Sequence, residues 1–241
     1  MIESNGDKGY AKIVDERFGY DPFEVLESGN QELTPKGKNA FWDAISAFKF
    51  RGPEPLIRML NSGKKYVVIR ALQVFSELGH PGVVLVDMAI ERIDLDDAAA
   101  KYYILDGALS HLGSLSDRQI ARLLSLSEES YANLRKRYIT LLTLLETSTI
   151  RNALPFLDKK KDLQFHEKGV QLLENAPSIE VLLHQAKSES KILSAYAYAA
   201  LLNLINTDVV NDLPATFGGG EEHDFLRFKL AQRQKKTRSR S

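Results

Sequence analysis

The sequence predicts an all-α solenoid of about five helix pairs that follows an N-terminal cap helix, on the basis of two observations. From Pro35 onward, apolar residues recur with the period of a helix, and the strict alternation of a strand is almost absent. Short and long apolar stretches also alternate, and the short ones end 30, 34 and 33 residues apart, at Leu60, Ile90, Leu124 and Leu157. A degenerate period of this size is typical of stacked helical repeats, in which each pair buries its apolar face against its neighbours.

The cap helix is expected at residues 34–50, with Thr34 as N-cap and Pro35 at the first helical position. One apolar stripe follows, made of Phe41, Trp42, Ile45 and Phe48. The single tryptophan is therefore expected to pack in the core. Arg51-Gly52-Pro53 ends the helix.

Five helix pairs are expected between residues 54 and 205, each a short helix followed by a longer one. Cap residues mark several of the starts, because Ser116 and Ser178 precede short helices and Asp96 or Asp97 precedes a long one. The expected pairs are 54–60 with 64–78, 83–93 with 97–112, 116–124 with 131–145, 149–157 with 162–173, and 178–186 with 190–205.

Two segments are expected outside the solenoid, which spans 34–213. Residues 1–33 are interpreted as an irregular N-terminal arm whose aromatic cluster, Phe18 to Leu26, docks on the first repeat. Residues 214–241 contain a Gly-rich linker and a basic tail. Although the whole chain has 32 basic and 32 acidic residues, residues 221–241 have seven Lys/Arg against three Asp/Glu. The tail is expected to be a disordered, solubilising segment, or to form a short helix at 225–230 that packs on the last repeat or on a partner.

Residues 55–81, PLIRMLNSGKKYVVIRALQVFSELGHP, resemble a repeat of the HEAT-like superfamily, and residues 97–113 echo the same pattern. The exit Leu78-Gly79-His80-Pro81 matches the family's Leu-Gly-Asp-Pro, with His80 where Asp is usual. The resemblance implies a right-handed, armadillo-type α-solenoid whose second helices line a concave side. Such arrays mostly bind proteins and sometimes nucleic acids, and no catalytic residues belong to the superfamily as a whole.

Several classes of function find no support in the sequence. The chain has no cysteine, its five histidines have no i, i+3 or i+4 pair, and no phosphate-binding glycine loop is present. We therefore predict no metal, no cofactor, no small-molecule substrate and no catalytic residue. The N-terminus lacks a basic and an apolar signal region, and the longest apolar stretches fall short of a membrane span, so a cytoplasmic protein without membrane contact is expected.

The leading hypothesis is a non-enzymatic scaffold, adaptor or inhibitor that binds another protein on its concave surface and flanking arms. Polar positions on the long helices of the first two repeats are the candidate partner contacts: Arg70, Gln73, Glu77, Lys101, Asp106 and Ser110. An alternative is nucleic-acid binding through the basic tail, with Arg233, Lys235, Lys236, Arg238 and Arg240 as the cations. A second alternative is a HEAT-like enzyme that acts on nucleic acid, for which the sequence offers little because Trp42 is expected in the core.

Overall fold

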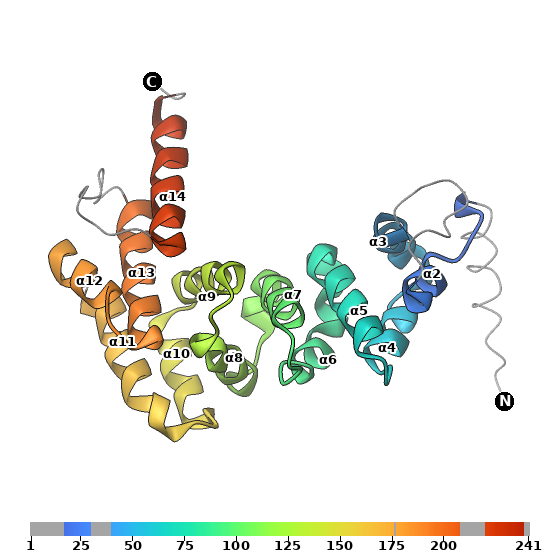
Figure 1. Ribbon diagram of the computed structural model, residues 1–241, viewed down its shortest axis with the longest axis horizontal. Helices are drawn as coiled ribbons and strands as arrows, with labels where there is room; N and C mark the ends of the chain where they lie inside the picture. The colour runs from blue at the N-terminus through green and yellow to red at the C-terminus, as the bar shows by residue number, and fades with distance from the viewer. Residues whose placement is uncertain (1–16, 30–39, 176, 208–219, 239–241) are drawn as a thin grey trace. The chain divides into compact units, whose positions relative to one another are not determined.

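The structure is a computed structural model that describes residues 17–29, 40–175, 177–207 and 220–238. Every regular element in these ranges is a helix, so the prediction of an all-α fold is confirmed there (Figure 1). The chain forms two compact units, which we call the N-terminal unit (Met1–His111) and the C-terminal unit (Leu112–Ser241). None of the described helices is both long and apolar enough to cross a membrane.

In the N-terminal unit, each long helix packs on the next long helix. The α-helix α3 contacts α5, α5 contacts α7, and the short helices α4 and α6 contact each other and their own long partners. This is the contact pattern that stacked helix pairs produce. The helices of this unit are α2 (Pro22–Ser28), α3 (Ala40–Arg51), α4 (Glu54–Leu60), α5 (Lys65–Leu78), the 3-10 helix η2 (His80–Leu85), α6 (Val86–Glu91), α7 (Ala98–Ala108) and the start of the 3-10 helix η3 (Leu109–Ser114).

Helix α2 corrects the interpretation of residues 1–33 as an irregular arm. The Asp21 carboxylate accepts a hydrogen bond from the Phe23 backbone N–H at 2.9 Å and so caps the helix. Phe23 and Leu26 are buried, and α2 contacts α3, α4 and α5. Through this helix the aromatic cluster packs on α4 and α5, the helices expected to form the first repeat, and the repeat itself stays a prediction.

The prediction that Trp42 packs in the core is wrong, because its side chain is 57% exposed. The buried face of α3 consists of Ala40, Ala44, Ala47 and Phe48. Small alanine side chains let α3 approach its neighbours closely, and this places the tryptophan on the outer face. The predicted start of the cap helix, Thr34-Pro35, lies outside the described residues.

The predicted helix boundaries agree best where a cap residue marks them. Asp97 caps α7, and Ser116 caps the next helix in a capping box with Gln119. Three predicted helices are instead divided into α and 3-10 segments. Residues 83–93 contain the end of η2 followed by α6, residues 97–112 contain α7 followed by η3, and residues 149–157 contain an α-helix that continues as a 3-10 helix.

The C-terminal unit is arranged around its longest apolar helix, α13, rather than as a simple stack. Helix α13 contacts α9, α11, α12 and α14 (Figure 1). In a linear array a helix pair contacts only adjacent pairs, so the contact between α9 and α13 departs from that pattern. The helices are α8 (Asp117–Leu124), η4 (Ser125–Glu128), α9 (Ala132–Leu144), α10 (Thr147–Ala153), η5 (Leu154–Phe156), η6 (Lys160–Asp162), α11 (Leu163–Asn175), α12 (Ile179–Ala186), α13 (Lys191–Asn206) and α14 (Glu221–Arg238).

Each unit contains a helical glycine that accommodates an aromatic ring of a neighbouring long helix. A Cβ atom on Gly107 of α7 would lie 2.2 Å from the Phe75 ring of α5. A Cβ atom on Gly169 of α11 would lie 2.3 Å from the Tyr196 ring of α13. Real Cβ atoms do not approach so closely, so each ring fills the space that the missing side chain leaves.

Helix α14 corrects the prediction of a disordered basic tail, because residues 221–238 form one helix that packs on α9 and α13, while residues 214–219 of the predicted linker lie outside the described residues. Its buried face consists of His223, Leu226 and Leu230, at i, i+3 and i+7. Glu222 and Glu221 at its N-terminus form ion pairs with Arg135 and Lys136 of α9, at 3.3 and 3.0 Å. The alternative of a short helix packed on the last repeat is therefore closest to the structure.

Candidate binding site

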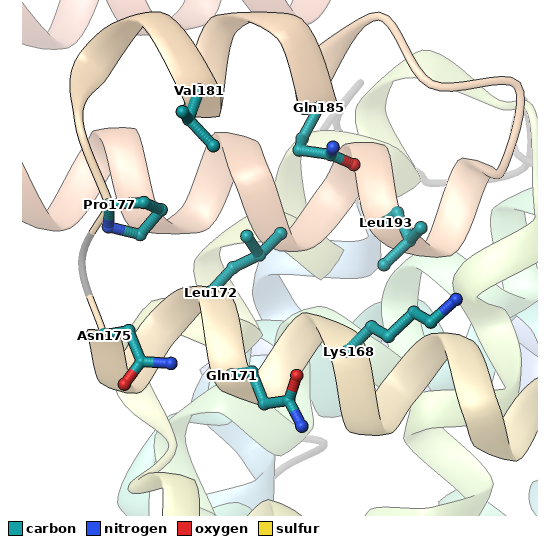
Figure 2. A pocket seen from close by; sticks show the side chains of 8 residues that line it. All are labelled: Lys168, Gln171, Leu172, Asn175, Pro177, Val181, Gln185 and Leu193. Carbon is teal, nitrogen blue, oxygen red and sulfur yellow. The ribbon is translucent and has the colours of Figure 1, made fainter.

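An open pocket lies between α11, α12 and α13 in the C-terminal unit (Figure 2). Its volume is about 290 Å³. The lining combines four apolar and four polar residues: Leu172, Pro177, Val181 and Leu193, with Lys168, Gln171, Asn175 and Gln185.

Helical spacing explains why these side chains meet. The four residues from α11 lie at i, i+3, i+4 and i+7, which is one face of a helix. Val181 and Gln185 lie one turn apart on α12 and extend toward that face (Figure 2). The Ser178 hydroxyl caps α12 by accepting a hydrogen bond from the Val181 N–H at 3.4 Å, which fixes where α12 begins. Leu193, near the start of α13, completes the wall.

We call Leu172, Val181 and Leu193 the apolar floor of the pocket, and Lys168, Gln171, Asn175 and Gln185 its polar rim. Leu172 and Leu193 are half-buried, and Val181 is 45% exposed although it is a large apolar residue. Within the described part of the chain, the side chains of Lys168, Gln171, Asn175 and Gln185 form no hydrogen bond or ion pair. Their donors and acceptors are thus free to meet a ligand.

Lys168 is the only lining residue that carries a formal charge at neutral pH. The nearby carboxylate of Glu174 is bound by Arg151 of α10 through two hydrogen bonds, of 2.9 and 2.5 Å. The hydrogen bond from Arg151 holds the pKa of Glu174 below its ordinary value, so this carboxylate stays ionised and paired. The electrostatic character of the pocket is therefore set by one ammonium group.

The dimensions and chemistry of the pocket suit binding of a small group. A volume of about 290 Å³ is at the lower end of the roughly 300–1,000 Å³ range typical of ligand pockets. It can hold one large apolar side chain, while the amides at the rim can donate to and accept from an adjacent peptide group. Among the described residues, no group of three or more His, Cys, Asp and Glu side chains is arranged to hold a metal ion.

The candidate partner residues of the N-terminal unit are divided between two adjacent helices. Arg70, Gln73 and Glu77 lie on α5, where the Arg70 guanidinium donates a hydrogen bond to the Gln73 amide oxygen at 2.8 Å. Lys101 and Asp106 lie on α7, and Ser110 lies on η3. Glu77 and Ser110 are exposed, and the other four are half-buried. The structure brings Arg70 and Gln73 together, and a partner surface at these six residues stays a prediction.

The candidate cations of the tail differ in exposure and in their contacts with the rest of the unit. The Arg233 guanidinium donates to the backbone carbonyl of Ile205 in the last turn of α13, so its charge meets an unpaired carbonyl at a helix C-terminus. Lys235 is exposed. Lys236 and Arg238 belong to the last turn of α14, and Arg240 lies outside the described residues. Arg233 thus serves to hold α14 on α13.

Two buried aromatic residues of the C-terminal unit form a polar contact in the core, away from the pocket lining. The Tyr196 hydroxyl lies 3.1 Å from Nδ1 of His166, and both side chains are almost completely buried. Burial lowers the pKa of His166 to about 4, so the imidazole is neutral at physiological pH and shares a hydrogen bond with the Tyr196 hydroxyl. We interpret this pair as part of the core.

Sequence reasoning did not find the pocket. The α11 stripe Lys168, Gln171, Leu172 and Asn175 is visible in the sequence, but three of its four residues are polar. Such a stripe looks the same as an ordinary solvated helix face. The stripe lines a pocket only because α12 and α13 pack beside it.

Comparison with known proteins adds no family or relative: no family model, no curated protein and no solved structure matches the chain. The resemblance of residues 55–81 to a HEAT-like repeat therefore stays a prediction, as does the right-handed solenoid.

Proposed function

We propose that this chain is a protein-interaction module that binds a segment of a partner protein in the pocket between α11, α12 and α13. The role is binding rather than catalysis, in keeping with an adaptor or inhibitor. One observation supports this proposal above all: an apolar floor lies beside four polar side chains that have no partner within the described chain.

A partner's apolar side chain would fill the floor formed by Leu172, Val181 and Leu193. Burial of one large apolar side chain stabilises a complex by about 1.5–3 kcal/mol. Gln171 and Gln185 each offer a donor and an acceptor, so they can pair with the backbone of an extended segment in either direction. Lys168 would favour a partner segment without positive charge at that position.

This location differs from the concave surface expected at Arg70 to Ser110. The pocket is preferred because the affinity of protein interfaces comes mainly from buried apolar anchors, with exposed polar contacts contributing little. Binding of nucleic acid by the tail is less favoured, since Arg233 contacts Ile205 and the first turn of α14 is acidic.

Two matched substitutions test the proposal. Val181→Arg places a long cationic side chain at the pocket, whereas Val84→Arg makes the same change at a valine of the N-terminal unit that is 59% exposed. Peptides selected from a random display library on the full chain are measured by fluorescence anisotropy against both variants. We expect peptides that bind the unchanged chain and Val84→Arg equally, and that bind Val181→Arg about ten-fold or more weakly.

Gln185→Ala provides a finer measurement, because it removes two hydrogen-bonding groups without filling the pocket. It should weaken the same peptides several-fold. If no selected peptide distinguishes Val181→Arg from Val84→Arg, the pocket is not a peptide site and the proposal is wrong.

A further inference from the structure

Five exposed residues of the C-terminal unit combine an aromatic ring with positive charge. Phe156 ends η5, Lys159 to Lys161 follow it at the start of η6, and Arg118 lies in the first turn of α8, which contacts η5. We call these five residues the lysine patch. The guanidinium carbon of Arg118 lies 5.5 Å from the centre of the Phe156 ring, and the ring remains 44% exposed.

The cations of the lysine patch are not neutralised by ion pairs within the described chain. Arg118, Lys159 and Lys161 form none there, and the ammonium of Lys160 donates to the neutral carbonyl of Pro155 at 3.1 Å. The carboxylates next to these four cations in the sequence are fewer: Asp117 and Asp158 are not buried, and Asp162 is buried. The charge of the whole unit has the same sign, since it contains 19 Lys/Arg and 15 Asp/Glu against 13 and 17 in the N-terminal unit.

An exposed phenylalanine beside unpaired cations matches one class of ligand in particular. In proteins that bind single-stranded nucleic acid, bases stack on aromatic rings while lysine and arginine contact the phosphates. The arginine above the ring adds a cation–π contact that holds both side chains in place. A duplex keeps its bases stacked inside, so it would use the charges of the patch and leave Phe156 without a partner.

We propose that the lysine patch binds single-stranded nucleic acid, with one base stacked on Phe156 and the phosphates on either side contacting Arg118, Lys159 and Lys161. This site is separate from the proposed peptide pocket, because none of the five patch residues lines the pocket and none lies on α11, α12 or α13. It also differs from the C-terminal tail, because its cations come from α8 and the segment before α11.

Fluorescence anisotropy with the full chain tests this proposal. The probes are labelled oligothymidylate and oligouridylate and a strand of the same length without bases, at roughly 50 mM and 200 mM salt. We expect both base-carrying strands to bind more tightly than the abasic strand, because only they can stack. If Arg118, Lys159 and Lys161 contact phosphates, affinity falls about 20-fold between the two salt concentrations.

Matched variants distinguish the contribution of the Phe156 ring to binding from that of the positive charges. Phe156→Ala should weaken binding of the base-carrying strands about five-fold or more and leave the abasic strand nearly unchanged. The double variant Lys159→Glu/Lys161→Glu, which keeps Lys160 on Pro155, should weaken all strands and reduce the salt dependence. The controls are Phe228→Ala, at a phenylalanine that is 57% exposed on α14, and Lys187→Glu, at an exposed lysine after α12.

Three outcomes would overturn the proposal: no binding at the lower salt concentration, equal affinity for strands with and without bases, or equal losses in the patch and control variants. Loss with Lys235→Glu but not with Lys159→Glu/Lys161→Glu would also overturn it, because binding would then depend on the tail. Tighter binding of a duplex of the same length than of the single strands would overturn it as well, because charge alone, without stacking, would then account for the contact.

Discussion

The two units bury their longest helices in different ways. In the N-terminal unit, the long helices α3 and α7 both pack on α5. In the C-terminal unit, α13 packs against α9, α11, α12, α14 and the 3-10 helix η4, and its alanines at 195, 197, 199 and 200 are all buried. A helix that is apolar on most of its surface must be covered on all sides, whereas an amphipathic helix needs cover on one face only.

The number of buried polar side chains also differs between the two units. Among the described residues, the N-terminal unit buries one polar side chain, His111, while the C-terminal unit buries six. Where several helices pack on a central helix, polar side chains at the edges of their apolar faces also become buried. Each then needs a partner, as Arg135 shows by donating to the carbonyls of Ser127 and Lys191 at 2.9 and 3.1 Å.

The largest expected effect therefore concerns Arg135. Arg135→Met keeps the apolar stem but leaves two carbonyl groups without their donor, at about 1–3 kcal/mol each. We expect the free energy of unfolding of the C-terminal unit to fall by about 3 kcal/mol in urea titrations followed by circular dichroism. Lys136→Met, one residue along the same helix, removes an exposed ion pair and should change stability by less than about 1 kcal/mol. Equal effects of the two variants would show that enclosure of polar groups does not distinguish the units.

The glycine–aromatic contacts are the feature that both units share. Alanine normally stabilises a helix relative to glycine by about 0.5–1 kcal/mol. Gly107→Ala and Gly169→Ala should instead destabilise by about 1–3 kcal/mol, because the new Cβ atom clashes with a buried ring. Gly113→Ala is the control, since a Cβ atom there meets nothing within 4 Å. Destabilisation in only one unit, measured by thermal unfolding, would contradict a common packing rule.

The lowered pKa of His166 predicts that the stability of the C-terminal unit depends on pH. Its folded pKa of about 4 lies below the unfolded value of about 6.5, so between these values the unfolded state binds more protons. Stability is therefore lost as the pH falls through this window, by about 1 kcal/mol near pH 5.5. Urea titrations at about pH 5.5 and 7.5 should show this loss, and His166→Gln should reduce it. Burial lowers the pKa of His111 in the same direction, so a residual slope from the N-terminal unit is expected.

The smallest effect is expected where α2 meets α4. Arg58 of α4 binds Glu27 of α2 at 2.6 Å, but its side chain is 56% exposed. Arg58→Ala should lower the free energy of unfolding by less than about 1 kcal/mol, and added salt should remove most of the difference. A larger loss would indicate that α2 is held mainly by charge rather than by Phe23 and Leu26.

Local signals in the sequence predicted the helices well where a cap was present. Ser116, Ser178 and Asp97 each begin a helix at the expected place, because a side-chain acceptor next to an apolar stripe is a strong local determinant. The interruption by η2 and η5 was not predicted, since Pro81 and Pro155 permit either a helix start or a 3-10 turn at these positions.

Features that depend on contacts between distant residues were not predictable in the same way. The exposure of Trp42 follows from which face of α3 the rest of the unit covers, and the sequence shows two apolar stripes, one of alanines and one of aromatic residues, without showing which of them is covered. The amphipathic pattern of residues 225–230 allowed a short helix, but the ion pairs of α14 with Arg135 and Lys136 join residues about 85 positions apart, which no local pattern indicates. The pocket required three helices to be placed before its lining could be recognised.

The Gly107–Phe75 contact also limits how α7 can align with α5. Sliding α7 by one turn, about 5.4 Å, would bring Tyr103 or His111 to the place where the phenyl ring now lies. Around Gly169, the same shift would bring Phe165 or Leu173 against Tyr196. In a shifted alignment, a bulky side chain would clash with the aromatic ring of the neighbouring helix. One glycine in each unit therefore favours the native alignment of the two helices during folding.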